Sequence, residues 1–204
     1  EIICGPMFAG KSTELLRRIR RHDIAGNRIR LVKPKTDTRS DRVHTHDGMT
    51  IAAVEVAELM DGLVSIEDHE VIAVDEVQFF EIQPGDLEVI FDLAKNGTRV
   101  IFAGVDLDHF GNPFETTATL MGISTSITKL TSVCADCGGL HASRTQWVSD
   151  LPYNEDTRVG GIDRYAPKCL DCFEPMDLDG EERLTVELVR NGVHPMATVL
   201  QFSR

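Results

Sequence analysis

The stretch Gly5-Pro-Met-Phe-Ala-Gly-Lys-Ser12 decides how this chain folds. It follows the pattern G-x-x-x-x-G-K-S, in which backbone N–H groups surround phosphate oxygens, the lysine reaches the β- and γ-phosphates and the serine can ligate Mg²⁺. Residues 1–4 before it form a short apolar run typical of a strand, and residues 13–21 after it have apolar side chains at helical spacing. A strand, a glycine loop and a helix N-terminus in this order favour nucleotide binding over a chance glycine turn.

The acidic end of a later strand is the second part of this predicted phosphate site. The apolar run at residues 70–75 ends in Asp75, and Glu76 follows it. Asp75 at this place can hold Mg²⁺ through water, together with Ser12. Glu76 points elsewhere and could act as a general base on a substrate. An isolated Asp-Glu pair is more often merely solvated, but the phosphate loop favours the functional interpretation. The loop residues that we expect to bind the nucleotide are Gly5, Pro6, Met7, Phe8, Ala9, Gly10, Lys11 and Ser12.

Apolar runs and helical patterns alternate up to about residue 130. The runs at residues 28–32, 98–104 and 126–131 are typical of strands, and residues 87–94 fit a helix that ends at Asn96-Gly97. Strands that alternate with helices predict an α/β fold with a mostly parallel, doubly wound sheet. Ligands of such sheets bind at the carboxyl ends of the strands, where the glycine loop also lies.

Four of the five cysteines form two C-x-x-C pairs. These are Cys134, Cys137, Cys169 and Cys172. Two such pairs predict a tetrahedral zinc site, and four sulfur ligands leave no open position, so the site is structural. Zinc is favoured over iron because nothing else indicates electron transfer. Two C-x-x-C pairs together with a nucleotide loop indicate a metal site and a reducing cytoplasm rather than disulfides, and Cys4 is expected to be a buried core thiol.

Composition sets further limits. The chain has 204 residues, 42% of them hydrophobic, and a net charge of −12. This charge disfavours a broad grip on nucleic acid, although solubility alone explains it. No stretch approaches the length of a membrane span and no secretory signal is apparent, so we expect no membrane partner. Because the first residue is Glu rather than Met, we expect a trimmed N-terminus.

The composition of the sequence changes near residue 131, where cysteines, glycines and charged residues replace the alternation of apolar runs and helical patterns. We predict three parts: an α/β P-loop nucleotide-binding domain over residues 1–130, a small zinc-binding domain with a loop over residues 131–175, and an extension of unassigned role over residues 176–204. Metal cross-linking is expected to replace a hydrophobic core in the second part.

Residues 1 to about 173 resemble the zinc-containing, RecA-like type of thymidine kinase family. The resemblance rests on the glycine loop, the two C-x-x-C pairs and five further segments. These segments are Asp37-Thr-Arg39, Thr45-His-Asp47, Asp75-Glu-Val-Gln-Phe-Phe80, Gly104-Val-Asp to Pro113-Phe114, and Val159-Gly-Gly-Ile-Asp-Arg-Tyr165. The glycine loop alone is generic, whereas the inner residues Pro6-Met7-Phe8 and the later segments are specific together.

The resemblance implies a RecA-like fold and an enzyme that transfers the γ-phosphoryl group of ATP to the 5′-hydroxyl of deoxythymidine, giving dTMP. Glu76 matches the catalytic base, and residues 156–165 match a lasso loop that closes over the thymine. Further residues implied near the ATP phosphates are Asp37, Thr38, Arg39, Asp75 and Gln78. Those implied at thymidine are Met7, Phe79, His109, Phe110, Phe114, Thr145, Arg158, Val159, Gly160, Gly161 and Tyr165. The resemblance also implies a homotetramer that is inhibited by dTTP.

Three positions depart from the family pattern. The family commonly has Asp-Phe-Arg-Gly where this chain has Asp108-His-Phe-Gly111, so either His109 or Phe110 stacks on the base. Trp147 stands where an arginine is common. Arg158 occupies a lasso position that is usually apolar, where it could partly replace the lost arginines or be neutral drift.

Two other functions compete with the kinase. The first is a P-loop ATPase whose zinc ribbon binds nucleic acid, which the acidic charge and the lack of an aromatic-basic patch near the cysteines disfavour. The second is a regulatory nucleotide-binding protein without activity. The presence of Glu76, Lys11 and Ser12 weighs against this second function.

Overall fold

One six-stranded parallel sheet organises the first part of the chain. The computed structural model describes residues 1–37, 42–44, 50–65, 68–151 and 159–174. The strand order is β5-β2-β6-β7-β1-β8, and all neighbouring strands are parallel. The strands are β1 (Ile2–Gly5), β2 (Ile29–Pro34), β5 (Val54–Val56), β6 (Val71–Val74), β7 (Arg99–Val105) and β8 (Ile127–Lys129). This sheet and its connecting helices confirm the predicted α/β class.

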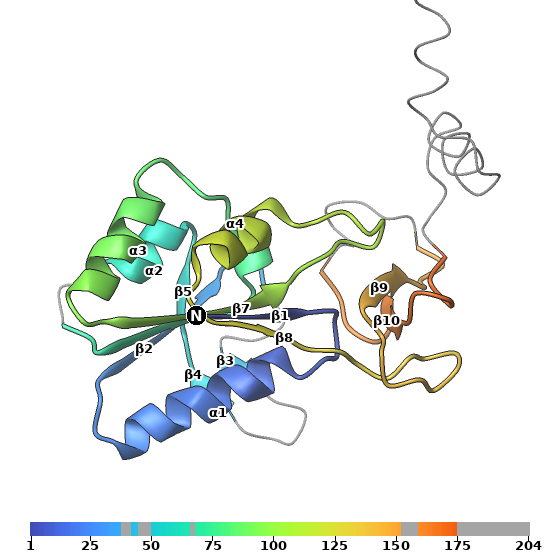
Figure 1. Cartoon of the computed structure of the whole chain (residues 1–204), viewed down its shortest axis with the longest axis horizontal. Helices are drawn as coiled ribbons and strands as arrows, with labels where there is room; N and C mark the ends of the chain where they lie inside the picture. Colours follow the sequence, from blue (N-terminus) through green and yellow to red (C-terminus); the bar gives the residue numbers. More distant parts are fainter. Residues whose placement is uncertain (38–41, 45–49, 66–67, 152–158, 175–204) are drawn as a thin grey trace, which may run out of the picture. The chain divides into compact units, whose positions relative to one another are not determined.

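Helices cover both faces of the sheet, with α1 on one face and α2, α3 and α4 on the other (Figure 1). The helices are α1 (Lys11–Ile24), α2 (Leu59–Leu63), α3 (Asp86–Lys95) and α4 (Glu115–Ile123). Consecutive strand residues point to opposite faces. Ile2 therefore packs in the core beside α3, whereas Ile3 packs in the core beside α1. Because both faces are covered, the central strands are continuous apolar runs.

The helices and strands predicted up to residue 130 are confirmed, with shifted ends. The helix predicted at residues 13–21 begins at Lys11 and ends at Ile24, because Gly10 at φ 81° closes the glycine loop directly before it. The helix predicted at residues 87–94 is α3, and its C-cap is Asn96. The hairpin of β3 (Arg42–His44) and β4 (Thr50–Ala52) was not predicted, because strands of three residues show no recognisable period.

The region after residue 131 contains a small antiparallel sheet. In it β9 (Arg144–Trp147) pairs with β10 (Tyr165–Lys168), with Tyr165 opposite Trp147. Residues Glu1–Phe173 form one compact unit and Glu174 begins a second one. The domain boundaries predicted at residues 130 and 175 stay predictions, and residues 176–204 lie outside the described residues. Among the helices of the described ranges, none combines the length and apolar character needed to cross a bilayer.

Candidate functional site

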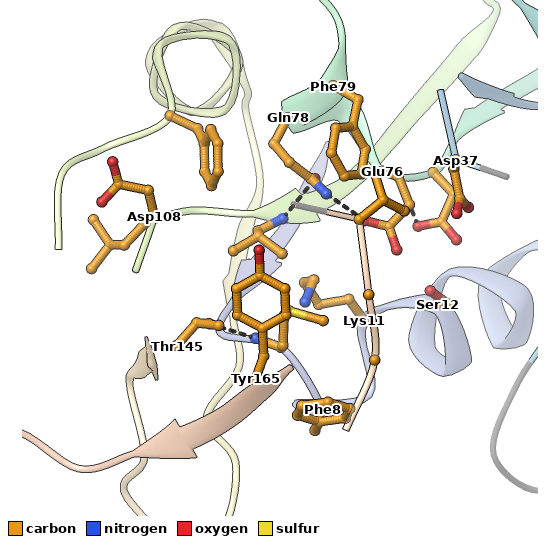
Figure 2. Close-up of a pocket in the computed structure, with 18 of the residues that line it drawn as sticks. Phe8, Lys11, Ser12, Asp37, Glu76, Gln78, Phe79, Asp108, Thr145 and Tyr165 are labelled. Atoms are coloured by element: carbon orange, nitrogen blue, oxygen red, sulfur yellow. Dashed lines mark hydrogen bonds between the residues drawn. The ribbon is translucent and has the colours of Figure 1, made fainter. Parts of the chain in front are cut away.

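A cavity of about 720 Å³ opens where the carboxyl ends of β1, β6 and β7 meet the 159–165 segment (Figure 2). This is the edge at which ligands bind in doubly wound sheets. The predicted residues that line it are Met7, Phe8, Gly10, Lys11, Ser12, Asp37, Asp75, Glu76, Gln78, Phe79, His109, Phe114, Thr145, Val159, Gly160, Gly161 and Tyr165. Residues far apart in the sequence therefore share one cavity of the size that holds a small ligand.

The glycine loop joins β1 to α1 and forms one wall of this cavity. Lys11 is the first residue of α1, and its buried Nζ donates to the carbonyl oxygen of Pro6 at 2.8 Å. Gly5 has a φ of 140°, and a Cβ there would lie 2.3 Å from the carbonyl oxygen of Leu130. The loop thus needs glycine at its start and lies at the positive end of α1, where phosphate oxygens are favoured.

The phosphate loop is also tied to the region that contains the cysteines. The backbone N–H of Met7 donates to Oγ1 of Thr145 at 3.0 Å, and Oγ of Ser132 donates to the carbonyl oxygen of Phe8 at 3.1 Å. Phe8 has a φ of 63°, which is uncommon outside glycine. These two hydrogen bonds hold the middle of the loop from outside, so the loop does not depend on its glycines alone.

Asp75 follows the last residue of β6 and is a buried carboxylate. Burial and the charge of Glu76 raise the pKa of Asp75 to about 7, and a hydrogen bond with Ser12 opposes this rise. The Asp75 side chain is only 4% exposed. A carboxylate in such a place is costly to ionise without a nearby cation. The pair of Asp75 and Ser12 therefore fits a divalent cation beside the phosphate loop.

The Glu76 carboxylate is held by the side chain of Gln78. Glu76 has a left-handed backbone with φ 54°, and it precedes the short helix η1 (Val77–Phe79). The Gln78 side-chain amide donates to Oε2 of Glu76, and its Oε1 accepts from the backbone N–H of Val105 at 2.9 Å (Figure 2). Gln78 thereby fixes the Glu76 carboxylate relative to the end of β7.

A fully buried lysine, which sequence reasoning missed, holds Asp37 at the cavity. Lys33 in β2 is 1% exposed, and its Nζ lies 3.3 Å from Oδ2 of Asp37 and 3.7 Å from Oε1 of Glu55. These two carboxylates keep the charge of the buried ammonium group paired. The parallel pairing of β2 with β5 brings Glu55 to this lysine, and no local sequence signal reveals that pairing.

The two predicted aromatic positions, His109 and Phe110, lie in the turn after β7. Oδ1 of Asp108 accepts from the backbone N–H groups of Phe110 at 2.9 Å and Asn112 at 2.8 Å. His109 is buried in this turn and lines the cavity, whereas Phe110 is not among the cavity residues. Burial lowers the pKa of His109, against the opposing charge of Asp108. The geometry therefore favours His109 over Phe110 as the ring that meets a bound base.

The described end of the predicted lasso, residues 159–165, is held by its own hydrogen bonds. Arg164 Nη1 donates to the carbonyl oxygen of Val159 at 2.8 Å, and the backbone N–H of Gly161 donates to Oδ1 of Asp163 at 3.0 Å. The backbone N–H of Tyr165 donates to the carbonyl oxygen of Gly161 at 3.0 Å. These bonds present Val159, Gly161 and Tyr165 together to the cavity.

Some predicted residues lie elsewhere, and some cavity residues were not predicted. Gly5, Pro6, Ala9 and Phe110 belong to the neighbouring loops but do not line the cavity. Thr38, Arg39 and Arg158 lie outside the described residues. Cavity residues missing from the prediction are Thr13, Val43, Phe80, Glu81, Val105, Leu107, Asp108 and Ile162. Asp108 could have been found from its place just after a predicted strand, where site residues gather.

The four predicted zinc ligands form one cluster. The sulfur atoms of Cys134, Cys137, Cys169 and Cys172 all lie within 4.8 Å of one another. Backbone N–H groups of Cys137 and Cys169 lower the pKa of the Cys134 thiol to about 6, which favours the thiolate that a metal binds. The cluster can therefore hold a tetrahedral zinc ion. Cys4, as predicted, is a buried core residue.

Comparison with known proteins gives consistent matches. A family model described as "Thymidine kinase" matches residues 1–173. Thymidine kinase of Chloroflexus aurantiacus (strain ATCC 29366 / DSM 635 / J-10-fl) is 37% identical over 182 residues, which cover 86% of this chain and 94% of the relative. Thymidine kinase of Rhodothermus sp. (strain ITI 518) is 38% identical over 179 residues, covering 86% of this chain and 81% of the relative.

Proposed function

Because this chain belongs to the thymidine kinase family, we propose that it transfers the γ-phosphoryl group of ATP to the 5′-hydroxyl of deoxythymidine. The products are ADP and dTMP. One observation carries this proposal: a single cavity joins a phosphate loop, a carboxylate pair and a wall of aromatic and lasso residues. A phosphate donor and a nucleoside acceptor need such neighbouring surfaces to meet in line.

At the donor end we assign ATP binding to the phosphate loop, with Lys11 beside the β- and γ-phosphates. The support is the position of Lys11, which is buried at the N-terminus of α1 and folded back over the loop at Pro6. We assign Mg²⁺ to Ser12 and Asp75, because a buried carboxylate with a raised pKa is stabilised by a nearby cation. When bound, Mg²⁺ supplies charge neutralisation to the transferring phosphoryl group.

At the acceptor end we assign the general base to Glu76. The 5′-oxygen forms a bond to the γ-phosphorus while the bond from that phosphorus to the bridging oxygen of ADP breaks, and the proton of the hydroxyl passes to the Glu76 carboxylate. Gln78 supports this role because its amide donates to Oε2 of Glu76 and so fixes the carboxylate at the cavity. Asp37, which we assign to the region of the ATP phosphates, also lines the cavity and is paired with the buried Lys33.

The thymidine itself is assigned to the part of the cavity that Tyr165, Thr145, Phe79 and His109 line. Tyr165 points into the cavity near Thr145, and Phe79 lies across from it beside Glu76 (Figure 2). We retain His109 rather than Phe110 as the ring over the base, because His109 lines the cavity. From the family resemblance we assign residues 159–161 to the base edge, although the Gly161 N–H and the Val159 and Gly161 carbonyl groups are bonded within the segment itself.

Four further proposals concern the state of the protein. We propose a structural zinc ion on the four clustered cysteines, supported by their mutual sulfur distances. We also propose a cytoplasmic setting, supported by the fact that none of the five cysteines, all of them among the described residues, forms a disulfide. The homotetramer and the inhibition by dTTP are proposed from the family resemblance.

The test is an ADP-release assay that compares the four deoxynucleosides as acceptors, with and without Mg²⁺. We expect strong turnover with thymidine only, a requirement for Mg²⁺, and no turnover in Glu76→Gln. Equal turnover with deoxycytidine would contradict the specificity. ADP release that DNA stimulates and thymidine does not would instead identify the nucleic-acid-binding ATPase.

A further inference from the structure

Trp147 is a residue that the proposed mechanism does not use, although it lies next to the substrate wall. It is the only tryptophan of the chain and the last residue of β9. The strand register places it directly opposite Tyr165, the first residue of β10. The Trp147 side chain is largely buried and is not among the residues that line the cavity.

The two rings make a defined edge-to-face contact. Their centroids are 5.1 Å apart and their planes meet at 79°. This is a preferred geometry for aromatic pairs, because the positive edge of one ring meets the negative face of the other. Tyr165 is 7% exposed and points into the cavity, so its ring is fixed from behind by a group that the substrate does not touch.

The Trp147 ring is itself anchored at a second point. Its Nε1–H donates to the carbonyl oxygen of Leu151 at 3.2 Å. One residue on, the backbone N–H of Val148 donates to the carbonyl oxygen of Arg164 at 2.8 Å, beside Tyr165. The indole therefore has little freedom to rotate. Because its ring contacts Tyr165, it also limits the rotation of the Tyr165 ring.

We propose that Trp147 is a positioning residue that holds Tyr165 in its binding orientation and thereby increases the affinity for thymidine. This inference rests on the proposed function, because it assigns a consequence to the thymidine wall of the cavity. The contact acts on the acceptor side alone, since neither ring contributes to the phosphate loop. Trp147 thus affects thymidine binding and leaves ATP binding unchanged.

Two substitutions separate the ring from the hydrogen bond. Trp147→Phe keeps an aromatic ring against Tyr165 and loses the donor to Leu151, whereas Trp147→Leu keeps apolar volume and loses the ring. For Trp147→Leu we expect the KM for thymidine to rise about threefold to tenfold, the range that the loss of an aromatic pair implies. The KM for ATP and kcat are expected to stay within about twofold, and Trp147→Phe should lie between wild type and Trp147→Leu.

A matched control tests whether reduced stability alone explains the effect. Ile90→Ala removes a buried side chain from α3, in the core away from the cavity, and destabilises the fold without touching Tyr165. The zinc-loaded variants are compared at temperatures equally far below their own Tm. An equal rise in thymidine KM for Ile90→Ala would overturn the proposal, and so would an unchanged KM for Trp147→Leu.

The single tryptophan also gives a direct binding signal, which does not depend on turnover. We expect thymidine to change the Trp147 emission of the full chain, ATP alone to leave it unchanged, and Tyr165→Leu to abolish the thymidine response. If wild type binds thymidine with no change in emission, the positioning role is wrong. If wild type neither binds nor phosphorylates thymidine, the proposed function fails instead, and with it the basis of this inference.

Discussion

Gln78→Leu is the substitution that tests most directly how Glu76 is held. In the wild type the Gln78 amide donates to Oε2 of Glu76 and accepts from the backbone N–H of Val105 at 2.9 Å. Leucine has a similar size and makes neither bond. Glu76 then keeps its charge but loses the group that orients it toward the acceptor.

The expected fall in kcat is estimated from the hydrogen bond between Gln78 and the charged Glu76 carboxylate. A hydrogen bond to a charged group contributes about 1.5–3 kcal/mol. Each 1.36 kcal/mol corresponds to about a factor of ten. If this orientation matters mainly in the transition state, kcat should fall about 10- to 100-fold while the KM for ATP changes little. The loss of the acceptor for Val105 adds a stability cost of about 1–3 kcal/mol.

Thr117→Val is the matched control. Oγ1 of Thr117 donates to the carbonyl oxygen of the same residue, Val105, at 2.8 Å and is fully buried. This variant should lose about 0.5–1.5 kcal/mol of stability in urea unfolding, with kcat unchanged. Steady-state ADP release at saturating substrates compares both variants. A kcat for Gln78→Leu within twofold of the Thr117→Val value would refute the positioning argument.

Three further predictions concern other parts of the site. Burial and the charge of Glu76 raise the Asp75 pKa from an ordinary 3.8 to about 7, so within this window the folded protein keeps a proton that the unfolded chain has lost. Without Mg²⁺, Tm should therefore fall as pH rises through this window, and Asp75→Asn should flatten the trend in a calorimetric series. In Gly160→Ala the new Cβ would lie 2.4 Å from Cδ of Arg164, so the thymidine KM should rise with an unchanged ATP KM, and a normal thymidine KM would contradict the packing. Cys169→Ser should abolish stoichiometric zinc in metal analysis and lower Tm, and retained zinc would show that the cluster is not the metal site.

The parts of the site that lie close together in the sequence could be predicted from it. Strand β1, the glycine loop and the start of α1 are continuous, so the position of Lys11 followed from spacing alone. Asp75 ended an apolar run that is typical of a buried strand, and Glu76 followed it. The two C-x-x-C pairs could be assigned to one cluster because a tetrahedral metal ion takes four ligands.

The contacts between distant elements could not be predicted. Gln78 finds the backbone of Val105 because β6 and β7 are neighbours in the sheet, and sequence gives no register between parallel strands. The burial of Lys33 was hidden for the same reason, since Glu55 reaches it only through the pairing of β2 with β5. Which of His109 and Phe110 lines the cavity depends on how the turn at Asp108 folds, and residue types alone do not reveal this.

The two hydrogen bonds that reach the phosphate loop from the region of the cysteines have a thermodynamic consequence. Thr145 holds Met7, and Ser132 holds Phe8, so the donor and acceptor sides of the cavity share an ordered boundary. Whatever ordering one substrate imposes on this boundary need not be imposed again by the other. We therefore expect ATP to strengthen thymidine binding, and by linkage thymidine should strengthen ATP binding by the same factor.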